Sequence, residues 1–374
     1  MNSEHLPTTH RRTRRALTAA VSAGVAAVAL AGTPTAVALT PGSSAPRPDP
    51  ALLEQCADTD TGSTVCTYPD LPPGHYDVTV MLGDRHESAS TRVQAETRRL
   101  MVDTVETDAG ELDRRTFTVN VRNPEAQQNG RDGEGSPGLT LTFTGDAPHV
   151  SGIGIHEASE GTRKIALLGD STVTDQSWVP YAGWGQELPT YFGRGVSVIN
   201  HSGSGESTTS VLAKSVMFDA LEPQLHGGDL VLVQLAHNDK TTTAEQYRAN
   251  LTEIVTRVRA TGATPVLVTP IVRHRFEGDQ LNSIGLIVTG EADLPAEMRG
   301  VATGLDVPLI DLTAMSEELV EGLGPVESEP IYMIRENGDR THTSEYGATV
   351  YAGLVAGALH DLGLVPERYW SATR

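Results

Sequence analysis

Apolar and polar residues alternate with a period of two between residues 51 and 158. The alternation is clearest over residues 74–83, 115–122 and 139–144. Successive side chains of a strand point to opposite faces of a sheet, so each segment predicts a strand with one buried face. Glycine, proline and aspartate residues separate the segments, as is typical of an antiparallel β-sandwich. The aromatic residues of these strands fall in the apolar register, which favours a place in the core over a sugar-binding surface: Tyr76, Phe117 and Phe143.

The pattern changes in the second part of the chain, residues 159–374. Short runs rich in β-branched and aliphatic residues now alternate with segments of helical period. The runs lie at residues 164–169, 196–200, 229–235, 264–270 and 307–312, and the clearest helical segments at residues 244–260 and 346–359. Such an alternation predicts a parallel sheet covered by helices. We therefore expect an α/β domain behind a smaller β-sandwich domain.

The first 50 residues are typical of an exported protein. A basic segment is followed by an alanine-rich apolar run and by Ala36-Val37-Ala38. This order predicts a secretory signal peptide over residues 1–38, and Arg14-Arg15 also allows a twin-arginine signal. The apolar run is too short for a membrane anchor. Residues 39–50 are rich in proline and serine and predict a disordered linker.

Composition limits the partners. The 374 residues include 48 acidic and 28 basic ones, for a formal charge of −20, which argues against nucleic acid as a ligand. The only cysteines, Cys56 and Cys66, flank a polar segment with turn residues. If the protein is exported, a disulfide between them is the favoured interpretation, and two free thiols are the alternative.

Polar residues follow three of the predicted parallel strands. They are Ser171, the segment 200–207 and the segment 237–239. Functional side chains of open α/β sheets collect at the carboxyl ends of the strands. A serine hydroxyl becomes a good nucleophile only when a base takes its proton. His342 offers that base, and Asp339, three residues earlier, is spaced to reach the same ring and orient it.

An acyl-transfer reaction also needs hydrogen-bond donors for the oxyanion that forms in its transition state. The backbone N–H groups of Ser171 and Gly205 and the side-chain amide of Asn238 are the candidates. No Cys/His cluster or H-E-x-x-H motif is present, so we expect neither a metal nor another cofactor.

These residues resemble the sequence blocks of the SGNH (GDSL) hydrolases, and in particular the rhamnogalacturonan acetylesterase branch, carbohydrate esterase family twelve. The matching segments are G-D-S-T-V-T-D-Q from Gly169, G-W-G-Q from Gly183, N-H-S-G-S-G-E-S from Asn200, H-N-D-K from His237 and D-R-T-H-T-S-E-Y-G-A from Asp339. The resemblance implies a three-layer α/β/α fold. It also implies the roles given above: Ser171 as nucleophile, His342 as base, Asp339 as its partner, and Ser171, Gly205 and Asn238 as the oxyanion hole.

The resemblance further implies a secreted, monomeric esterase that removes O-acetyl groups from a plant cell-wall polysaccharide such as rhamnogalacturonan. Residues expected to contact this acetylated carbohydrate are Asp170, Trp184, His237 and Arg273. Two alternatives remain. One is a GDSL-type lipase or general carboxylesterase, although aromatic residues make up only 5% of the chain. The other is a carbohydrate-binding protein with an inactive hydrolase core, which the retained Ser171, Asp339 and His342 disfavour.

The chain departs from the family pattern at two positions. Ala236 stands where the third block usually has glycine, and an alanine is tolerated there unless the backbone needs a positive φ. Glu206 stands where the second block commonly has arginine, which removes a positive charge expected near an anionic substrate. Arg273, His274 and Arg275 either supply cationic contacts instead or belong to a solvated loop.

Overall fold

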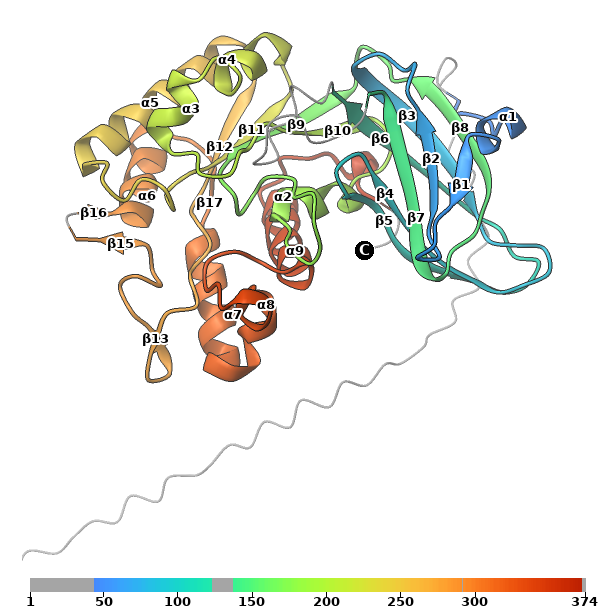
Figure 1. Ribbon diagram of the computed structural model, residues 1–374. Helices are drawn as coiled ribbons and strands as arrows, with labels where there is room; N and C mark the ends of the chain where they lie inside the picture. Colours follow the sequence, from blue (N-terminus) through green and yellow to red (C-terminus); the bar gives the residue numbers. More distant parts are fainter. Residues whose placement is uncertain (1–43, 123–136, 291, 372–374) are drawn as a thin grey trace, which may run out of the picture. The chain divides into compact units, whose positions relative to one another are not determined.

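Among the described residues, eight strands between Cys56 and Glu157 build two antiparallel sheets, drawn in blue to green in Figure 1. The computed structural model describes residues 44–122, 137–290 and 292–371. The first sheet has the order β1-β2-β7-β4-β5 and the second the order β6-β3-β8. The strands are β1 (Cys56–Asp58), β2 (Thr64–Tyr68), β3 (Gly74–Leu82), β4 (Ala89–Ala95), β5 (Arg99–Thr107), β6 (Asp113–Val121), β7 (Leu139–Ala147) and β8 (Val150–Glu157).

The two sheets share one apolar core. Tyr76 and Phe117 come from the smaller sheet and Phe143 from the larger, and they are 3%, 2% and 0% exposed. Because the alternating side chains of both sheets meet in this core, the segment folds as a β-sandwich, as the period of two predicts. The prediction that the three aromatic side chains belong to the core is confirmed.

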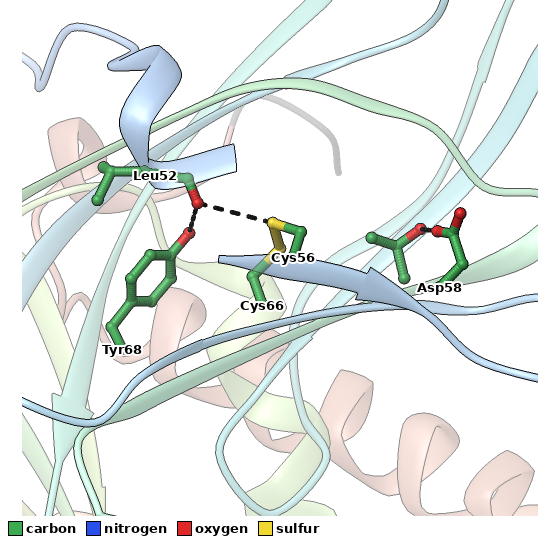
Figure 2. The surroundings of a disulfide bond; sticks show 6 residues. Leu52, Cys56, Asp58, Cys66 and Tyr68 are labelled. Carbon is green, nitrogen blue, oxygen red and sulfur yellow. Dashed lines mark hydrogen bonds between the residues drawn. A yellow bond between two sulfur atoms is a disulfide. The ribbon is translucent and has the colours of Figure 1, made fainter. Parts of the chain in front are cut away.

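A disulfide joins the edge strand β1 to β2. Cys56 and Cys66 are opposite each other in the antiparallel pair, and their sulfur atoms are bonded. Figure 2 shows Tyr68 beside this bond, with its hydroxyl donating to the Leu52 carbonyl at 3.0 Å. The bond therefore fastens the edge of the larger sheet near the beginning of the described chain.

Replacing both cysteines by serine is expected to lower the free energy of unfolding by about 2–3 kcal/mol, because the disulfide restricts the unfolded chain. Urea titration of the double variant Cys56→Ser/Cys66→Ser against the unchanged protein measures this loss. Reduction of the unchanged protein should give the same loss. An equal free energy of unfolding in oxidised and reduced protein would contradict the prediction.

The described chain begins inside the predicted linker. The signal peptide predicted for residues 1–38 lies outside the described residues, as does the linker up to residue 43. Residues 44–50 differ from the expected disorder, because they lie against strand β8. Asp49 donates its backbone N–H to the Ile153 carbonyl at 2.8 Å, and the Pro46 carbonyl accepts from Arg114 at 3.1 Å. Asp49 then caps the short helix α1 (Pro50–Leu53).

The second part of the chain contains a five-stranded, wholly parallel sheet with the order β10-β9-β11-β12-β17. Its strands are β9 (Arg163–Gly169), β10 (Val196–Asn200), β11 (Leu230–Gln234), β12 (Thr264–Val268) and β17 (Leu309–Ile310). Strand β9 lies between β10 and β11. The carboxyl ends of these three strands therefore meet at one edge of the sheet, where Ser171, Gly205 and Asn238 follow.

Helices cover both faces of this sheet (Figure 1). One face packs against α2 (Trp184–Glu187), α7 (Leu312–Glu327) and α9 (Glu345–Asp361). The other packs against α3 (Thr208–Ala213), α4 (Phe218–Leu221), α5 (Ala244–Ala260) and α6 (Leu294–Leu305). The helix predicted for residues 244–260 is α5, and its apolar side packs in this second layer, with Tyr247 and Leu251 both 0% exposed. The predicted three-layer α/β/α fold behind a β-sandwich is confirmed.

Small elements also lie before α6 and before α9. They are the strands β13 (Phe276–Glu277), β14 (Gln280–Leu281), β15 (Val288–Thr289) and β16 (Ala292–Asp293) and the helix α8 (Ile334–Asn337). Among the helices of the described residues, none is long and apolar enough to cross a lipid bilayer.

Candidate active site

Ser171 lies in a tight turn after strand β9. Gly169 starts this turn, and a Cβ atom there would lie 2.6 Å from the Val173 side chain, so only glycine fits. The Ser171 hydroxyl is 2.8 Å from Nε2 of His342, although the two residues are 171 positions apart in the chain. At this distance the histidine can accept the hydroxyl proton.

Asp339 lies on the other side of the His342 ring. Its Oδ2 atom is 2.6 Å from Nδ1 of His342, and its Oδ1 atom accepts the backbone N–H of Thr341 at 2.8 Å. Partial burial by itself raises the pKa of Asp339, but these hydrogen bonds outweigh it and lower the pKa to about 2. The carboxylate is therefore ionised at neutral pH, which fixes the ring with Nε2 facing Ser171 and stabilises a positive charge on it.

Gly205 and Asn238 lie together beside this group. Gly205 has a φ of +82°, which favours glycine. The Asn238 amide donates at 2.9 Å to the carbonyl of Glu206, the residue that follows Gly205. Within the described part of the chain, the N–H groups of Ser171 and Gly205 donate to no other group. Three donors are thus available for an oxyanion, and Ala236, before the Asn238 turn, has no positive φ that would require glycine.

Ser171 and His342 open into a cavity of about 620 Å³. Three cationic side chains, Lys240, Arg273 and Arg275, line it with them. The lining residues are Ser171, His237, Asn238, Lys240, Arg273, Arg275, Asn282, Ile284, Asp339, Thr341 and His342. A negatively charged ligand fits this lining better than a neutral one.

Two of the four residues expected to contact substrate line this cavity, namely His237 and Arg273. The other two do not, and this corrects the prediction. Asp170 is 0% exposed and accepts hydrogen bonds from the backbone N–H of Thr172 and from His237. Trp184 is 1% exposed and donates its indole N–H to Gln234 in the core. Motif membership indicated both residues, but their side chains point into the protein.

Glu206 is not a negative charge facing the substrate. It is 4% exposed, forms an ion pair with Lys214 at 2.5 Å and accepts a hydrogen bond from the hydroxyl group of Ser210. These contacts hold it against helix α3, outside the residues that line the cavity. The substitution therefore leaves the positive character of the cavity intact.

Two residues of the segment 273–275 supply cationic side chains to the cavity and the third is buried, so the segment is not a solvated loop. Arg273 and Arg275 line the cavity. His274 is buried and packs edge-on against Tyr332 and Phe276. Lys240 follows the H-N-D motif directly, but its place in the cavity was not predicted from the sequence. In the described ranges no three His, Cys, Asp or Glu side chains are placed to hold a metal ion.

Known proteins match both the sequence and the fold. Residues 167–348 match the GDSL-like lipase/acylhydrolase family. A relative, rhamnogalacturonan acetylesterase RhgT from Bacillus subtilis, is 36% identical over 217 residues, which are 54% of this chain and 91% of the relative. The chain belongs to the GDSL/SGNH hydrolase family. This hydrolase is therefore a carboxylic ester hydrolase, and the predicted family membership is confirmed.

Two further matches extend into the β-sandwich. The hydrolase is 28% identical over 305 residues to the uncharacterized esterase YxiM of Bacillus subtilis, covering 79% of this chain and 74% of that protein. The crystal structure of YxiM matches with a TM-score of 0.50 at 23% identity, over 87% of this chain and 96% of that one. This likeness supports the fold.

Proposed function

We propose that the chain is a secreted serine esterase that removes O-acetyl groups from an acidic plant cell-wall polysaccharide such as rhamnogalacturonan. The observation that carries the proposal is the hydrogen-bonded triad of Ser171, His342 and Asp339. It lies at the wall of a cavity that three cationic side chains also line. The relative named rhamnogalacturonan acetylesterase, at 36% identity, supports the same substrate class.

The geometry suits a double displacement. Ser171 attacks the acetyl carbonyl carbon while His342 takes the hydroxyl proton at Nε2. The N–H groups of Ser171 and Gly205 and the Asn238 amide hold the carbonyl oxygen as it becomes negative. The tetrahedral intermediate then collapses, and His342 passes the proton to the departing sugar oxygen. Water, deprotonated by His342, attacks the acetyl-enzyme, and acetate leaves as Ser171 regains its proton.

The cavity lining favours a charged polymer over a long acyl chain. Lys240, Arg273 and Arg275 attract the carboxylates of a uronic-acid backbone. Ile284 is the only aliphatic residue among the described residues that line the cavity. A lipase needs a continuous apolar surface beside its nucleophile to hold the acyl chain.

The disulfide and the start of the chain support export. Disulfides persist in oxidising compartments, and Cys56 and Cys66 are bonded. The basic, apolar and small-residue order of residues 1–38 is that of a secretory signal.

Acetate release tests the proposed substrate. The purified protein is assayed on acetylated rhamnogalacturonan, on acetylated xylan, and on acetyl and long-chain p-nitrophenyl esters. We expect release from the acidic polymer and from the short ester. Release from xylan alone would contradict the acidic-polymer assignment, and preference for long chains would support the lipase alternative.

Removing the cationic side chains separates substrate binding from chemistry. The variant Lys240→Gln/Arg275→Gln is expected to raise KM for the acidic polymer about five- to thirtyfold, because each of the two lost contacts is worth about 0.5–1 kcal/mol at a partly exposed site. Its kcat/KM for p-nitrophenyl acetate should stay within about twofold, since neither side chain takes part in the hydrogen bonds that join Ser171, His342 and Asp339. An unchanged KM for the polymer would remove these residues from the proposed binding surface.

A further inference from the structure

A buried ion pair connects the β-sandwich to the turn that carries Ser171. Arg99, the first residue of β5, is 1% exposed and donates from Nε to Oδ2 of Asp175 at 2.7 Å. Asp175 lies four residues after Ser171 and is 3% exposed. Among the described residues, the cationic groups within 4 Å of this carboxylate are Arg99 and Arg122, and both come from the sandwich.

The same carboxylate connects two loops of the active site. Its Oδ1 atom accepts from the amide of Asn200 at 2.8 Å, and that amide also donates to the Val173 carbonyl at 2.9 Å. Asn200 ends strand β10 and begins the segment that leads to Gly205. Arg122 of the sandwich donates to the Asn200 carbonyl at 2.8 Å. The distance between the Ser171 turn and the Gly205 loop therefore depends on the Asp175 carboxylate. The positive charges that compensate this carboxylate, on Arg99 and Arg122, belong to the β-sandwich.

The turn 96–98, between β4 and β5, adds a second connection. Glu96 and Arg98 have φ values of +56° and +55°, which are unfavourable for side-chain-bearing residues. Arg98 donates to the carbonyls of Gln176 at 3.1 Å and Tyr181 at 2.9 Å, and the Thr97 carbonyl accepts from Gln186 at 2.7 Å. Strained turns of this kind persist where surrounding contacts fix them, often at functional sites.

Gln176 carries this connection back to the nucleophile. Its side-chain amide donates to the Ser171 carbonyl at 3.1 Å, and its backbone N–H donates to Gln186 at 3.1 Å. The sandwich thus contacts the Ser171 turn both through Asp175 and through Gln176. A domain that served only to bind the polymer would not need buried contacts with the turn that carries the nucleophile.

We propose that the sandwich is a structural part of the esterase site, and that Arg99 is a positioning residue that acts through Asp175 and Asn200 to hold the Ser171 and Gly205 amides at the spacing an oxyanion requires. This inference rests on the proposed role of Ser171. A buried carboxylate without its partner either takes up a proton or moves toward water. Either change displaces the two loops, and displacement of oxyanion donors lowers the rate more than it weakens substrate binding.

The test uses the full chain and p-nitrophenyl acetate, a substrate too small to need a polymer-binding surface. Arg99→Met is expected to lower kcat about 10- to 100-fold with KM within about twofold, and Arg99→Lys to recover part of the loss. Arg115→Met is the matched control, because Arg115 pairs with Asp113 on its own strand of the sandwich. Its kcat should equal that of the unchanged protein.

A second variant separates positioning from stability. Arg99→Met/Asp175→Asn removes both charges, so it should regain unfolding temperature relative to Arg99→Met while kcat stays low. A folded Arg99→Met with kcat within about twofold of the unchanged protein would overturn the inference, and so would full recovery of kcat in the double variant. Ser171→Ala, assayed alongside, reports on the nucleophile separately.

Discussion

Ser171→Ala is expected to lower kcat on acetylated rhamnogalacturonan and on p-nitrophenyl acetate by about 10⁴- to 10⁶-fold. The variant is expected to keep the fold, since the change removes one hydroxyl group, which is hydrogen-bonded to His342 at the wall of the cavity. KM for the polymer should change little, because the cationic side chains that bind it remain. Acetate release under saturating substrate, with a thermal unfolding scan, measures both properties.

A serine outside the site provides the control. Ser151 is exposed on β8 and donates to the Met81 carbonyl within the sandwich. Ser151→Ala should retain full activity. If Ser171→Ala keeps more than about one hundredth of the rate, another group is the nucleophile and the proposed mechanism fails.

Asp339→Asn is expected to lower kcat by about 10³- to 10⁴-fold with little change in KM. The pKa of about 2 shows that the protein holds this carboxylate ionised. An amide cannot stabilise the imidazolium that forms when His342 takes the Ser171 proton. It also leaves the ring free to face Ser171 with the wrong tautomer.

The pH profile gives this prediction a second readout. In the unchanged protein the pKa of Asp339 is lowered to about 2, so a fall of kcat/KM in mild acid is expected to come from the base and not from Asp339. Asp339→Asn should retain a slow rate that rises further in alkali, where hydroxide can replace the base. Asp361→Asn is the matched control, because Asp361 also lies beside a histidine but on the exposed surface. Its Oδ1 atom is 3.5 Å from Nδ1 of His360. A loss below about tenfold in Asp339→Asn would contradict the orienting role.

Much of the fold follows from local sequence patterns. The period of two at residues 74–83 and the apolar run at residues 164–169 correspond to β3 and β9. The carboxyl ends of parallel strands lie at the same edge of a sheet. The sequence therefore predicts that Ser171 and the segment 200–207 lie together at that edge. The spacing of Asp339 and His342 likewise predicted their contact.

Side-chain direction within the motifs did not follow from sequence. Asp170 and Trp184 belong to the same motifs as residues that line the cavity, but both point into the core. In a tight turn, neighbouring side chains face opposite ways, and motif membership does not say which one meets solvent. The loss of an expected arginine at Glu206 is offset by Lys240, which comes from a different strand end.

The buried contacts between the domains were also beyond the sequence. The segment 94–101 carries charges that suit either an exposed edge or an interface. Arg99 is fully buried only because Asp175, 76 residues later, lies opposite it. No local period encodes such a pair, since its stability comes from tertiary burial of two charges together.

Detection of an acetyl-enzyme would identify Ser171 as the nucleophile. The protein is mixed with acetylated rhamnogalacturonan, quenched in acid within the first turnovers, digested and examined by mass spectrometry. We expect a peptide containing Ser171 that is heavier by one acetyl group, about 42 Da, and no such peptide from Ser171→Ala. Acetate release without any acetylated Ser171, or with the acetyl group on another residue, would contradict this expectation.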